Sequence, residues 1–241
     1  MFHSFFLFVL LYAINCNCDI IFLVIWVRLR NVKNKQNILS SSTLLIKDYK
    51  DIKGSWNKLF NNNNPIYIEI GMGKGDFILG NALMHPNINF IGIEKYDSVI
   101  ARAIQKIEGR EDIPSNLKLL RMDAKEIEEA FDKEITRIYL TFSDPWPKKR
   151  HSERRLTSKT FLDKYDKIFK NTKEIIMKTD NTSLFEYSLA TLSNNGYVFE
   201  KVSLDLHNSD IENNIMTEYE KKFTEKNIKI NYLFAKKNEK C

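Results

Sequence analysis

Short apolar runs alternate with amphipathic stretches along the chain after residue 64. Apolar runs bounded by turn residues are typical of buried strands, and an apolar repeat at every third or fourth position is typical of helices. The predicted strands are Ile66–Ile70, Asn89–Ile93, Leu117–Arg121, Ile135–Phe142, Glu174–Met177, Tyr197–Leu204 and Ile228–Ala235. The predicted helices are Asp76–Met84, Ser98–Ile107, Ser158–Phe169 and Leu184–Leu192.

The order of these elements predicts an α/β protein. Strands separated by helices form parallel βαβ units, whose sheet is covered by helices on both faces. The last two predicted strands form a terminal pair. We therefore expect a Rossmann-like, mostly parallel seven-stranded sheet that includes an antiparallel C-terminal strand.

Residues 1–27 do not fit this alternation, because they are apolar and carry no Lys or Arg. A signal peptide would need a basic first region and a small-residue cleavage site, and neither is present. A membrane anchor remains open, although Asp19 near the middle would cost about 2.5–3.5 kcal/mol on insertion. The composition changes abruptly at Val27, which favours the interpretation that translation starts there and that residues 1–27 are a start-site artefact.

Residues 28–64 are polar and rich in Asn and Lys, with a short amphipathic stretch around Trp56. They predict a basic N-terminal arm and one helix, followed by the α/β domain in residues 65–241. The whole chain has 37 Lys and Arg against 31 Asp and Glu, a net charge of +6. This balance favours a polyanionic partner, because basic residues that neutralise phosphates release condensed counterions.

The three cysteines, Cys16, Cys18 and Cys241, argue against a disulfide framework and for a reducing, cytoplasmic compartment. They also lack the further Cys or His ligands of a zinc site, so no metal is expected.

The first predicted strand runs into the sequence Glu69-Ile70-Gly71-Met72-Gly73-Lys74-Gly75. Ligands of doubly wound sheets bind at the carboxyl ends of the strands, and glycines there let the backbone approach a ligand closely. A carboxylate before a G-x-G-x-G loop suits a cationic amino acid moiety better than a pyrophosphate. A tight turn without a ligand is the alternative.

Two further acidic residues follow the next two strands. Glu94 ends the second strand, where a carboxylate accepts from ribose hydroxyls or, alternatively, pairs with Lys95 on the surface. Asp123 ends the third strand and lies at the adenine edge or caps the helix that follows. Three acidic residues after three successive strands resemble the class I S-adenosylmethionine methyltransferase fold.

The fourth strand ends in a turn in which two prolines flank Trp146. Such a turn is rigid, and it would hold Asp144 beside a methyl donor while offering an aromatic face to a base. A dense basic stretch follows, Lys148–Arg155, with His151 inside it. This stretch predicts phosphate contacts, with a solvated helix face as the alternative.

Several motifs together resemble the bacterial tRNA (guanine-N7)-methyltransferase family. They are Ser143–His151, Arg154–Thr157, Lys178–Asn181, Leu184–Tyr187, Thr217–Glu220 and Lys222-Phe223. The resemblance spans roughly Arg28 to Ala235 and makes residues 65–241 the methyltransferase domain. It departs from the family at Met72, where a smaller residue is usual, and at Asp123, where either Asp or Asn is expected.

The resemblance implies a role for each motif residue. The S-adenosylmethionine site would comprise Glu69, Gly71, Gly73, Glu94, Asp123 and Asp144, with Asp144 also the catalytic carboxylate. The guanosine site would comprise Lys148, Asp180, Thr217, Glu218, Tyr219 and Glu220. The RNA contacts would come from Lys149, Arg150, His151, Arg154 and Arg155. Trp146 and Tyr219 are candidate stacking surfaces for the base.

The reaction that the resemblance implies is methylation of a guanine in the tRNA variable loop, nucleotide 46, at N7. The partner would be tRNA, and the enzyme would act as a monomer or homodimer without an obligatory protein partner. Two other interpretations stay open: a class I methyltransferase acting on a protein or small-molecule nitrogen, and a non-catalytic RNA-binding protein with an inactive methyltransferase fold.

Overall fold

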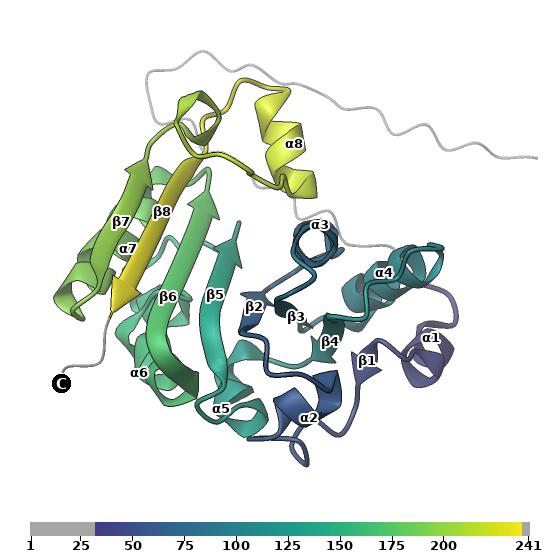
Figure 1. Ribbon diagram of the computed structural model, residues 1–241. Helices are drawn as coiled ribbons and strands as arrows, with labels where there is room; N and C mark the ends of the chain where they lie inside the picture. The colour runs from purple at the N-terminus through teal and green to yellow at the C-terminus, as the bar shows by residue number, and fades with distance from the viewer. Residues whose placement is uncertain (1–31, 238–241) are drawn as a thin grey trace, which may run out of the picture.

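The computed structural model describes residues 32–237, so residues 1–27 and the three cysteines lie outside the described residues. The described part contains one eight-stranded sheet in the order β1-β4-β3-β2-β5-β6-β8-β7 (Figure 1). The strands are β1 (Leu45–Ile46), β2 (Ile66–Ile70), β3 (Asn89–Glu94), β4 (Leu117–Arg121), β5 (Ile135–Thr141), β6 (Phe169–Thr179), β7 (Val198–Ser203) and β8 (Asn231–Lys237). The α-helices are α1 (Lys35–Ser41), α2 (Trp56–Phe60), α3 (Asp76–Met84), α4 (Asp97–Glu108), α5 (Ile127–Ala130), α6 (Lys159–Ile168), α7 (Thr182–Asn194) and α8 (Glu218–Thr224). Three 3₁₀ turns complete the structure: η1 (Ala124–Glu126), η2 (Lys149–Arg154) and η3 (Leu206–Asn208).

The mostly parallel sheet and its antiparallel last strand are confirmed. Strands β1 to β6 pair in parallel, and β8 lies antiparallel between β6 and β7. The predicted count of seven strands is wrong by one, because Leu45 and Ile46 pair with β4 at the edge of the sheet. A strand of two residues is too short to produce a hydrophobic pattern that sequence reasoning can detect.

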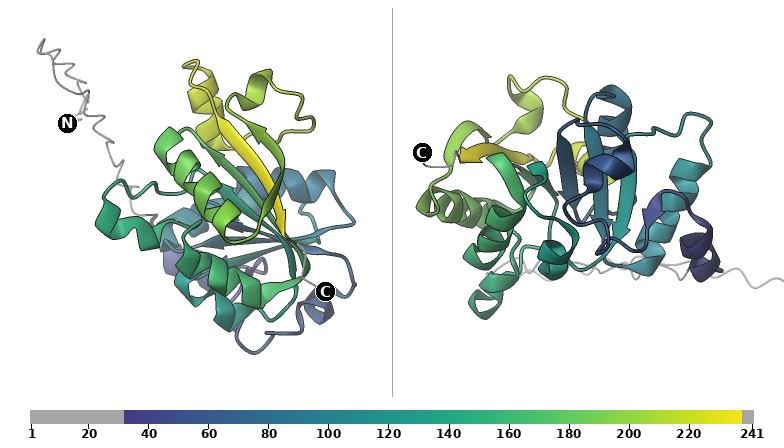
Figure 2. Two further views of the ribbon diagram at one scale, coloured as in Figure 1. Left: turned by 90° about the vertical axis from the view of Figure 1, so that its left-hand side faces the viewer. Right: turned by 60° about the horizontal axis from the view of Figure 1, so that its bottom comes forward.

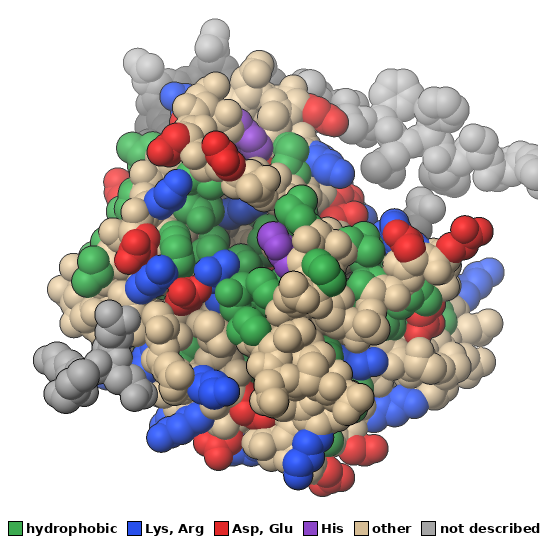
Figure 3. All heavy atoms as spheres, in the orientation of Figure 1, with side chains coloured by type: hydrophobic (Ala, Val, Ile, Leu, Met, Phe, Trp, Pro, Cys, Tyr) green, Lys and Arg blue, Asp and Glu red, His purple; other side chains and the backbone are tan. Residues whose placement is uncertain are grey.

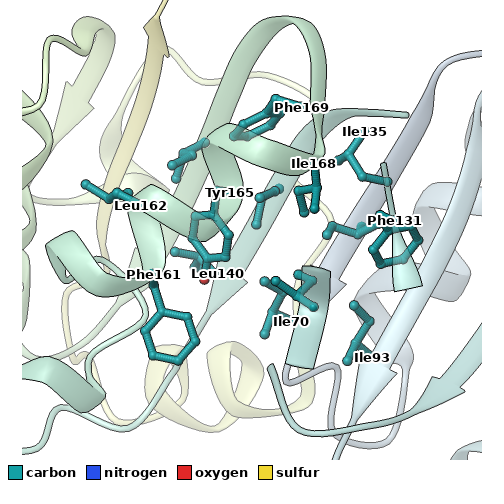
Figure 4. Close-up of a cluster of buried hydrophobic side chains, with 14 of the residues drawn as sticks. Ile70, Ile93, Phe131, Ile135, Leu140, Phe161, Leu162, Tyr165, Ile168 and Phe169 are labelled. Carbon is teal, nitrogen blue, oxygen red and sulfur yellow. The ribbon is translucent and has the colours of Figure 1, made fainter. Parts of the chain in front are cut away.

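The sheet carries a separate apolar core on each face. Alternate residues of a strand point to opposite faces, so Ile91 and Ile93 of β3 pack with α5, α6 and α7, whereas Phe90 packs with α3 and α4. Figure 2 shows α6 and α7 side by side on one face. The core on this face includes Phe131, Tyr165 and other fully buried side chains (Figure 4). No helix among the described residues is long and apolar enough to cross a membrane.

The topology brings the functional motifs to one edge. Strands β3 and β5 flank β2 on opposite sides, so the chain reverses its direction of winding at β2. The carboxyl ends of β2 to β6 point the same way, and α8 lies above them at the top of Figure 1. Ligands of open α/β sheets bind at such a switch point.

Gly92 of β3 explains why Met72 is accommodated in the glycine loop. A Cβ at position 92 would lie 2.3 Å from the Met72 Sδ and 3.1 Å from a methyl group of Leu119. The buried Met72 side chain therefore uses the space that a side chain on β3 would otherwise fill.

Trp56 joins the N-terminal residues to the core. Its side chain is fully buried, its ring packs 5.3 Å from that of Phe131, and its Nε1–H donates to the Ala130 carbonyl at 2.8 Å. The structure has the expected helix around Trp56, α2, but the expectation of one helix in residues 28–64 is wrong, because α1 lies in the stretch assigned to the arm.

We expect Trp56→Phe to lower the free energy of unfolding by about 2–3 kcal/mol, because it leaves the Ala130 carbonyl unpaired and removes buried volume. Urea unfolding of the purified protein measures this change. Leu59→Ala, on the same helix but 37% exposed, is the matched control and should cost less than about 1 kcal/mol. Equal losses in the two variants would contradict the anchoring role of Trp56.

Candidate active site

The loop between β2 and α3 has the backbone of a ligand-binding turn. Gly71, Gly73 and Gly75 have φ values of 80°, 58° and 76°, a region that L side chains rarely adopt. The Gly71 and Met72 N–H groups donate to the Ile93 carbonyl at 2.9 and 3.0 Å, which ties the loop to the end of β3.

Glu94 lies against this loop, as its place at the end of β3 predicts. Its Oε1 accepts from the Lys95 and Tyr96 N–H groups at 2.8 and 2.9 Å, and its Oε2 accepts from the Gly73 N–H at 3.2 Å. Burial raises the pKa of Glu94, while the three backbone donors oppose that rise. Oε2 keeps one lone pair for a further donor.

Glu69 is buried at the end of β2, only 1% exposed. Its Oε1 accepts from the Thr141 hydroxyl at 2.6 Å, and its Oε2 has no hydrogen-bond partner among the described residues. Burial raises the pKa of Glu69 to about 7, against the opposing effects of the Thr141 hydrogen bond and the Lys178 charge. A buried carboxylate oxygen without a partner is costly, so it marks a place for a ligand.

Asp123 is used as a cap in this structure. Its Oδ1 accepts from the Lys125 N–H at 3.1 Å at the start of η1, and its Oδ2 pairs with Lys95 at 2.6 Å. Although partial burial raises the pKa of Asp123, the bond to Lys95 lowers it below the usual value. Asp123 therefore acts as the cap of η1, which is one of the two expected roles. It lies just after the carboxyl end of β4.

The turn after β5 has a strained backbone. Phe142 and Trp146 have φ values of 52° and 43°, which bulky non-glycine residues adopt rarely. Asp144 lies between them with an exposed carboxylate that makes no ion pair or hydrogen bond with another described residue. Partial burial raises the pKa of Asp144, and its charge contributes to the raised pKa of Glu94.

The basic stretch divides into two groups. Arg155 points inward: it donates to the carbonyls of Pro145 and Trp146, at 3.1 Å each, and lies 4.2 Å over the Tyr187 ring. Arg154 lies 4.9 Å over the Trp146 ring. The side chains of Lys148, Lys149 and Arg150 are exposed, while His151 is partly buried and packs edge-on against Trp146. Arg155 therefore supports the turn, and the exposed residues are the ones available to a polyanion.

The segment Thr217–Glu220 begins α8. The Thr217 hydroxyl accepts from the Glu220 N–H, and the Glu220 carboxylate accepts in return from the Thr217 N–H, which forms a capping box. Glu218 pairs with Lys74 of the glycine loop at 2.7 Å and with Lys222 at 2.6 Å. Tyr219 is 59% exposed. Thr217 and Glu220 are thus buried by the start of α8, while Glu218 and Tyr219 remain accessible.

Rings and carboxylates from several elements lie along this edge. Tyr219 stacks on Phe142 with centroids 6.3 Å apart, so α8 contacts the strained turn directly. Asp180 follows β6 on the same edge, and partial burial raises its pKa. In the space-filling view, hydrophobic side chains gather in the middle of the face below α8 (Figure 3). Among residues 32–237, no group of His, Cys, Asp and Glu is arranged to hold a metal ion.

Sequence reasoning missed four residues that the geometry adds to this edge: Lys74, Thr141, Lys178 and Asn214. Lys178 and Thr141 are partners in the register of β5 and β6. The available signal was a lysine inside an apolar strand, since such a residue is rarely buried without a partner.

Solved structures share this fold. An antibiotic-related methyltransferase aligns with a TM-score of 0.60 at 17% identity, covering 80% of this chain and 96% of the other. The 16S rRNA methyltransferase KamB aligns with a TM-score of 0.57 at 10% identity, covering 77% and 93%. A family model described as "Putative methyltransferase" matches residues 63–233. The sheet order and these matches define a class I methyltransferase.

The chain belongs to the tRNA (guanine-N7)-methyltransferase family. The tRNA (guanine-N(7)-)-methyltransferase of Listeria welshimeri is 53% identical over 204 residues, 84% of this chain and 94% of the relative. That of Bacillus velezensis is 52% identical over 188 residues, 78% of this chain and 86% of the relative. That of Lachnoclostridium phytofermentans is 48% identical over 210 residues, covering 86% and 97%.

The raised pKa of Glu69 predicts a pH-dependent stability. Between the ordinary carboxyl pKa and about 7, the folded protein holds a proton that the unfolded chain has lost, so Glu69 destabilises the fold increasingly as pH rises through this window. Glu69→Gln cannot ionise and therefore lacks this loss of stability. We expect the free energy of unfolding of the variant minus that of the unsubstituted protein to increase by about 2–3 kcal/mol from pH 5 to pH 8. Denaturant titrations at both pH values measure it. A constant difference would mean that Glu69 is ionised throughout.

Proposed function

We propose that this protein transfers a methyl group from S-adenosylmethionine to N7 of a guanine in tRNA, at nucleotide 46 of the variable loop. One observation carries the proposal: the Asp144 carboxylate lies in a strained turn at the carboxyl end of β5, on the same edge of the sheet as Glu94, and the stacked Phe142–Tyr219 rings join this turn to α8. Similarity of most of the chain to tRNA (guanine-N(7)-)-methyltransferases supports the choice of substrate.

The carboxylates at this edge fit the methyl donor. The unpaired Glu69 Oε2 suits the donor's amino group, and the free lone pair of the Glu94 Oε2 suits a ribose hydroxyl. Asp123 follows β4, one strand further along, and would lie at the adenine edge. S-adenosylmethionine, when bound, supplies a sulfonium carbon that is open to attack by a nucleophile.

The chemistry requires alignment more than proton transfer. The guanine N7 has an in-plane lone pair and carries no proton, so this lone pair forms the new N–C bond while the C–S electron pair returns to sulfur. The guanine gains a positive charge, and no proton leaves in this step. Asp144 would stabilise the developing charge, because its carboxylate has no competing cation among the described residues.

Selection of guanine requires acceptors for its N1–H and amino group. Asp180 and Glu218 are both carboxylates at this edge, and the bonds to Lys222 and Lys74 lower the pKa of Glu218 despite partial burial, which keeps it ionised as an acceptor. Adenine lacks the N1–H and the 2-amino group, so it would leave these acceptors unpaired. The exposed Tyr219 ring offers a stacking surface for a base that has left its own stack.

Asp144→Asn should lower kcat for methyl transfer on the order of 100-fold, because it removes the negative charge that faces the alkylated guanine. The measurement is transfer of tritiated methyl from S-adenosylmethionine to unmodified tRNA, followed by digestion and quantification of 7-methylguanosine.

Asp163→Asn is the matched control, since Asp163 is an exposed carboxylate on α6 that pairs with Lys159. It should retain full activity. Label in another nucleoside, or in no nucleoside while S-adenosylhomocysteine still binds, would overturn the proposed substrate and favour a protein or small-molecule acceptor. Absence of S-adenosylhomocysteine binding would favour an inactive methyltransferase fold.

Salt dependence separates the two groups of basic residues. Arg150→Gln should reduce the slope of log affinity for tRNA against log salt by about 0.7–0.9, because one phosphate contact is lost. Arg155→Gln should leave this slope unchanged and instead lower thermal stability, since Arg155 donates to the turn carbonyls. Fluorescence anisotropy across a salt series measures the slopes, and a reduced slope for Arg155→Gln would contradict this division.

A further inference from the structure

Lys178 is a buried ammonium whose hydrogen-bonding capacity is fully used. It occupies the carboxyl end of β6, and its side chain is 3% exposed. Its Nζ donates to the Asn214 Oδ1, to the Ile215 carbonyl at 2.8 Å and to the Glu220 Oε2 at 3.1 Å. A lysine has three N–H donors, so every one of them is directed at the segment 214–220.

The other end of this ion pair is equally enclosed. Glu220 is fully buried, and its Oε1 accepts from the Asn214 Nδ2 at 2.6 Å. Its Oε2 accepts from the Thr217 N–H at 3.3 Å as well as from Lys178. The residues that begin α8 are therefore folded around one charge that comes from the sheet.

Lys178 also lies next to the proposed cofactor carboxylate. Its register partner on β5 is Thr141, whose hydroxyl binds Glu69. The positive charge of Lys178 favours the ionised form of Glu69, and its Nζ lies 4.7 Å over the Phe77 ring of α3. The same side chain thus contacts the segment that begins α8 and influences the carboxylate at the end of β2.

The start of α8 has other contacts with its surroundings. Ile215 packs against Gly80 of α3, where an added Cβ would lie 2.8 Å from an Ile215 methyl group. Such apolar contacts fix the distance of the segment from α3, whereas hydrogen bonds to a charge also fix its orientation. A buried ion pair is a weak source of net stability, so its presence here indicates a role in placing these residues.

We propose that Lys178 is a positioning residue that holds the segment Asn214–Glu220 in the orientation that binds the substrate guanosine. This inference rests on the proposed function and adds a residue that makes no contact with the base itself. Glu218 and Tyr219 are the accessible residues of that segment and follow directly after Thr217, the N-cap residue of α8. Because Thr217 is bonded to Glu220, which accepts from Lys178, their positions depend on the bonds that Lys178 makes.

The test compares Lys178→Met with the unsubstituted protein under steady-state conditions. Methionine keeps the unbranched shape of the side chain, one atom shorter, and removes the three donors and the charge. We expect KM for tRNA to rise at least about tenfold, with a smaller change in kcat at saturating tRNA. The Kd for S-adenosylhomocysteine, measured by calorimetry, should rise less than KM for tRNA does, since Glu69 loses the nearby charge of Lys178 but keeps its bond to Thr141. Amide hydrogen exchange should accelerate in residues 209–224 and stay unchanged in β2 and β3.

Two further variants keep the test decisive. Lys173→Met changes another buried lysine of β6, which lies in the amino-terminal half of the strand and pairs with Asp166 at 2.9 Å, and should leave KM for tRNA unchanged. The double variant Lys178→Met/Glu220→Gln removes both buried charges and allows folding even if the single variant unfolds. It should recover thermal stability while KM for tRNA stays raised, because Asn214 and Ile215 still lack their donor.

Recovery of both stability and KM in the double variant would overturn the proposal, since Lys178 would then serve only to neutralise Glu220. A parallel loss of S-adenosylhomocysteine affinity would overturn it as well. Failure of the proposed function is recognised separately, because the unsubstituted protein would then form no 7-methylguanosine, while hydrogen exchange would still report whether Lys178 holds residues 214–220.

Discussion

The parallel register of β2 with β3 and β5 is the constraint on which the site depends. It brings the glycine loop, Glu94 and the strained turn around Asp144 to one edge, although these residues are far apart in the sequence. The same edge concentrates buried charge, because Glu69 and Lys178 lie on neighbouring parts of one face. Charge burial on this scale opposes folding, and the two apolar cores on either side of the sheet supply the compensating stability.

Strand-end residues were predictable from the sequence because periodicity locates strands and the parallel topology fixes where strands end. Glu69 and Glu94 lie where this reasoning places them, and the predicted strand Ile66–Ile70 matches β2 in full. β1 was not predictable, since a strand of two residues is too short to show an alternation of apolar and polar positions. The inward orientation of Arg155 was not predictable either, because the sequence shows a run of basic residues but not which of them meets a backbone carbonyl.

Several residues that the resemblance assigns to ligands also make capping hydrogen bonds within the protein. Thr217 and Glu220 cap α8, and Asp123 caps η1. A capping role and a binding role compete only when they need the same lone pair, and a carboxylate has about four. The local geometry therefore leaves room for both, and it places the accessible groups of the C-terminal segment at Glu218 and Tyr219.

The contact between Met72 and Gly92 links the glycine loop to the middle of the sheet. A side chain at position 92 would meet the Met72 sulfur at 2.3 Å and a Leu119 methyl group at 3.1 Å, so an enlargement of Gly92 requires Met72 to move or to be shorter. A shorter residue at position 72, by contrast, leaves only a small void that Leu119 and neighbouring side chains border. The sizes of the residues at positions 72 and 92 are therefore coupled, so the effect of a substitution at one of them depends on the residue at the other.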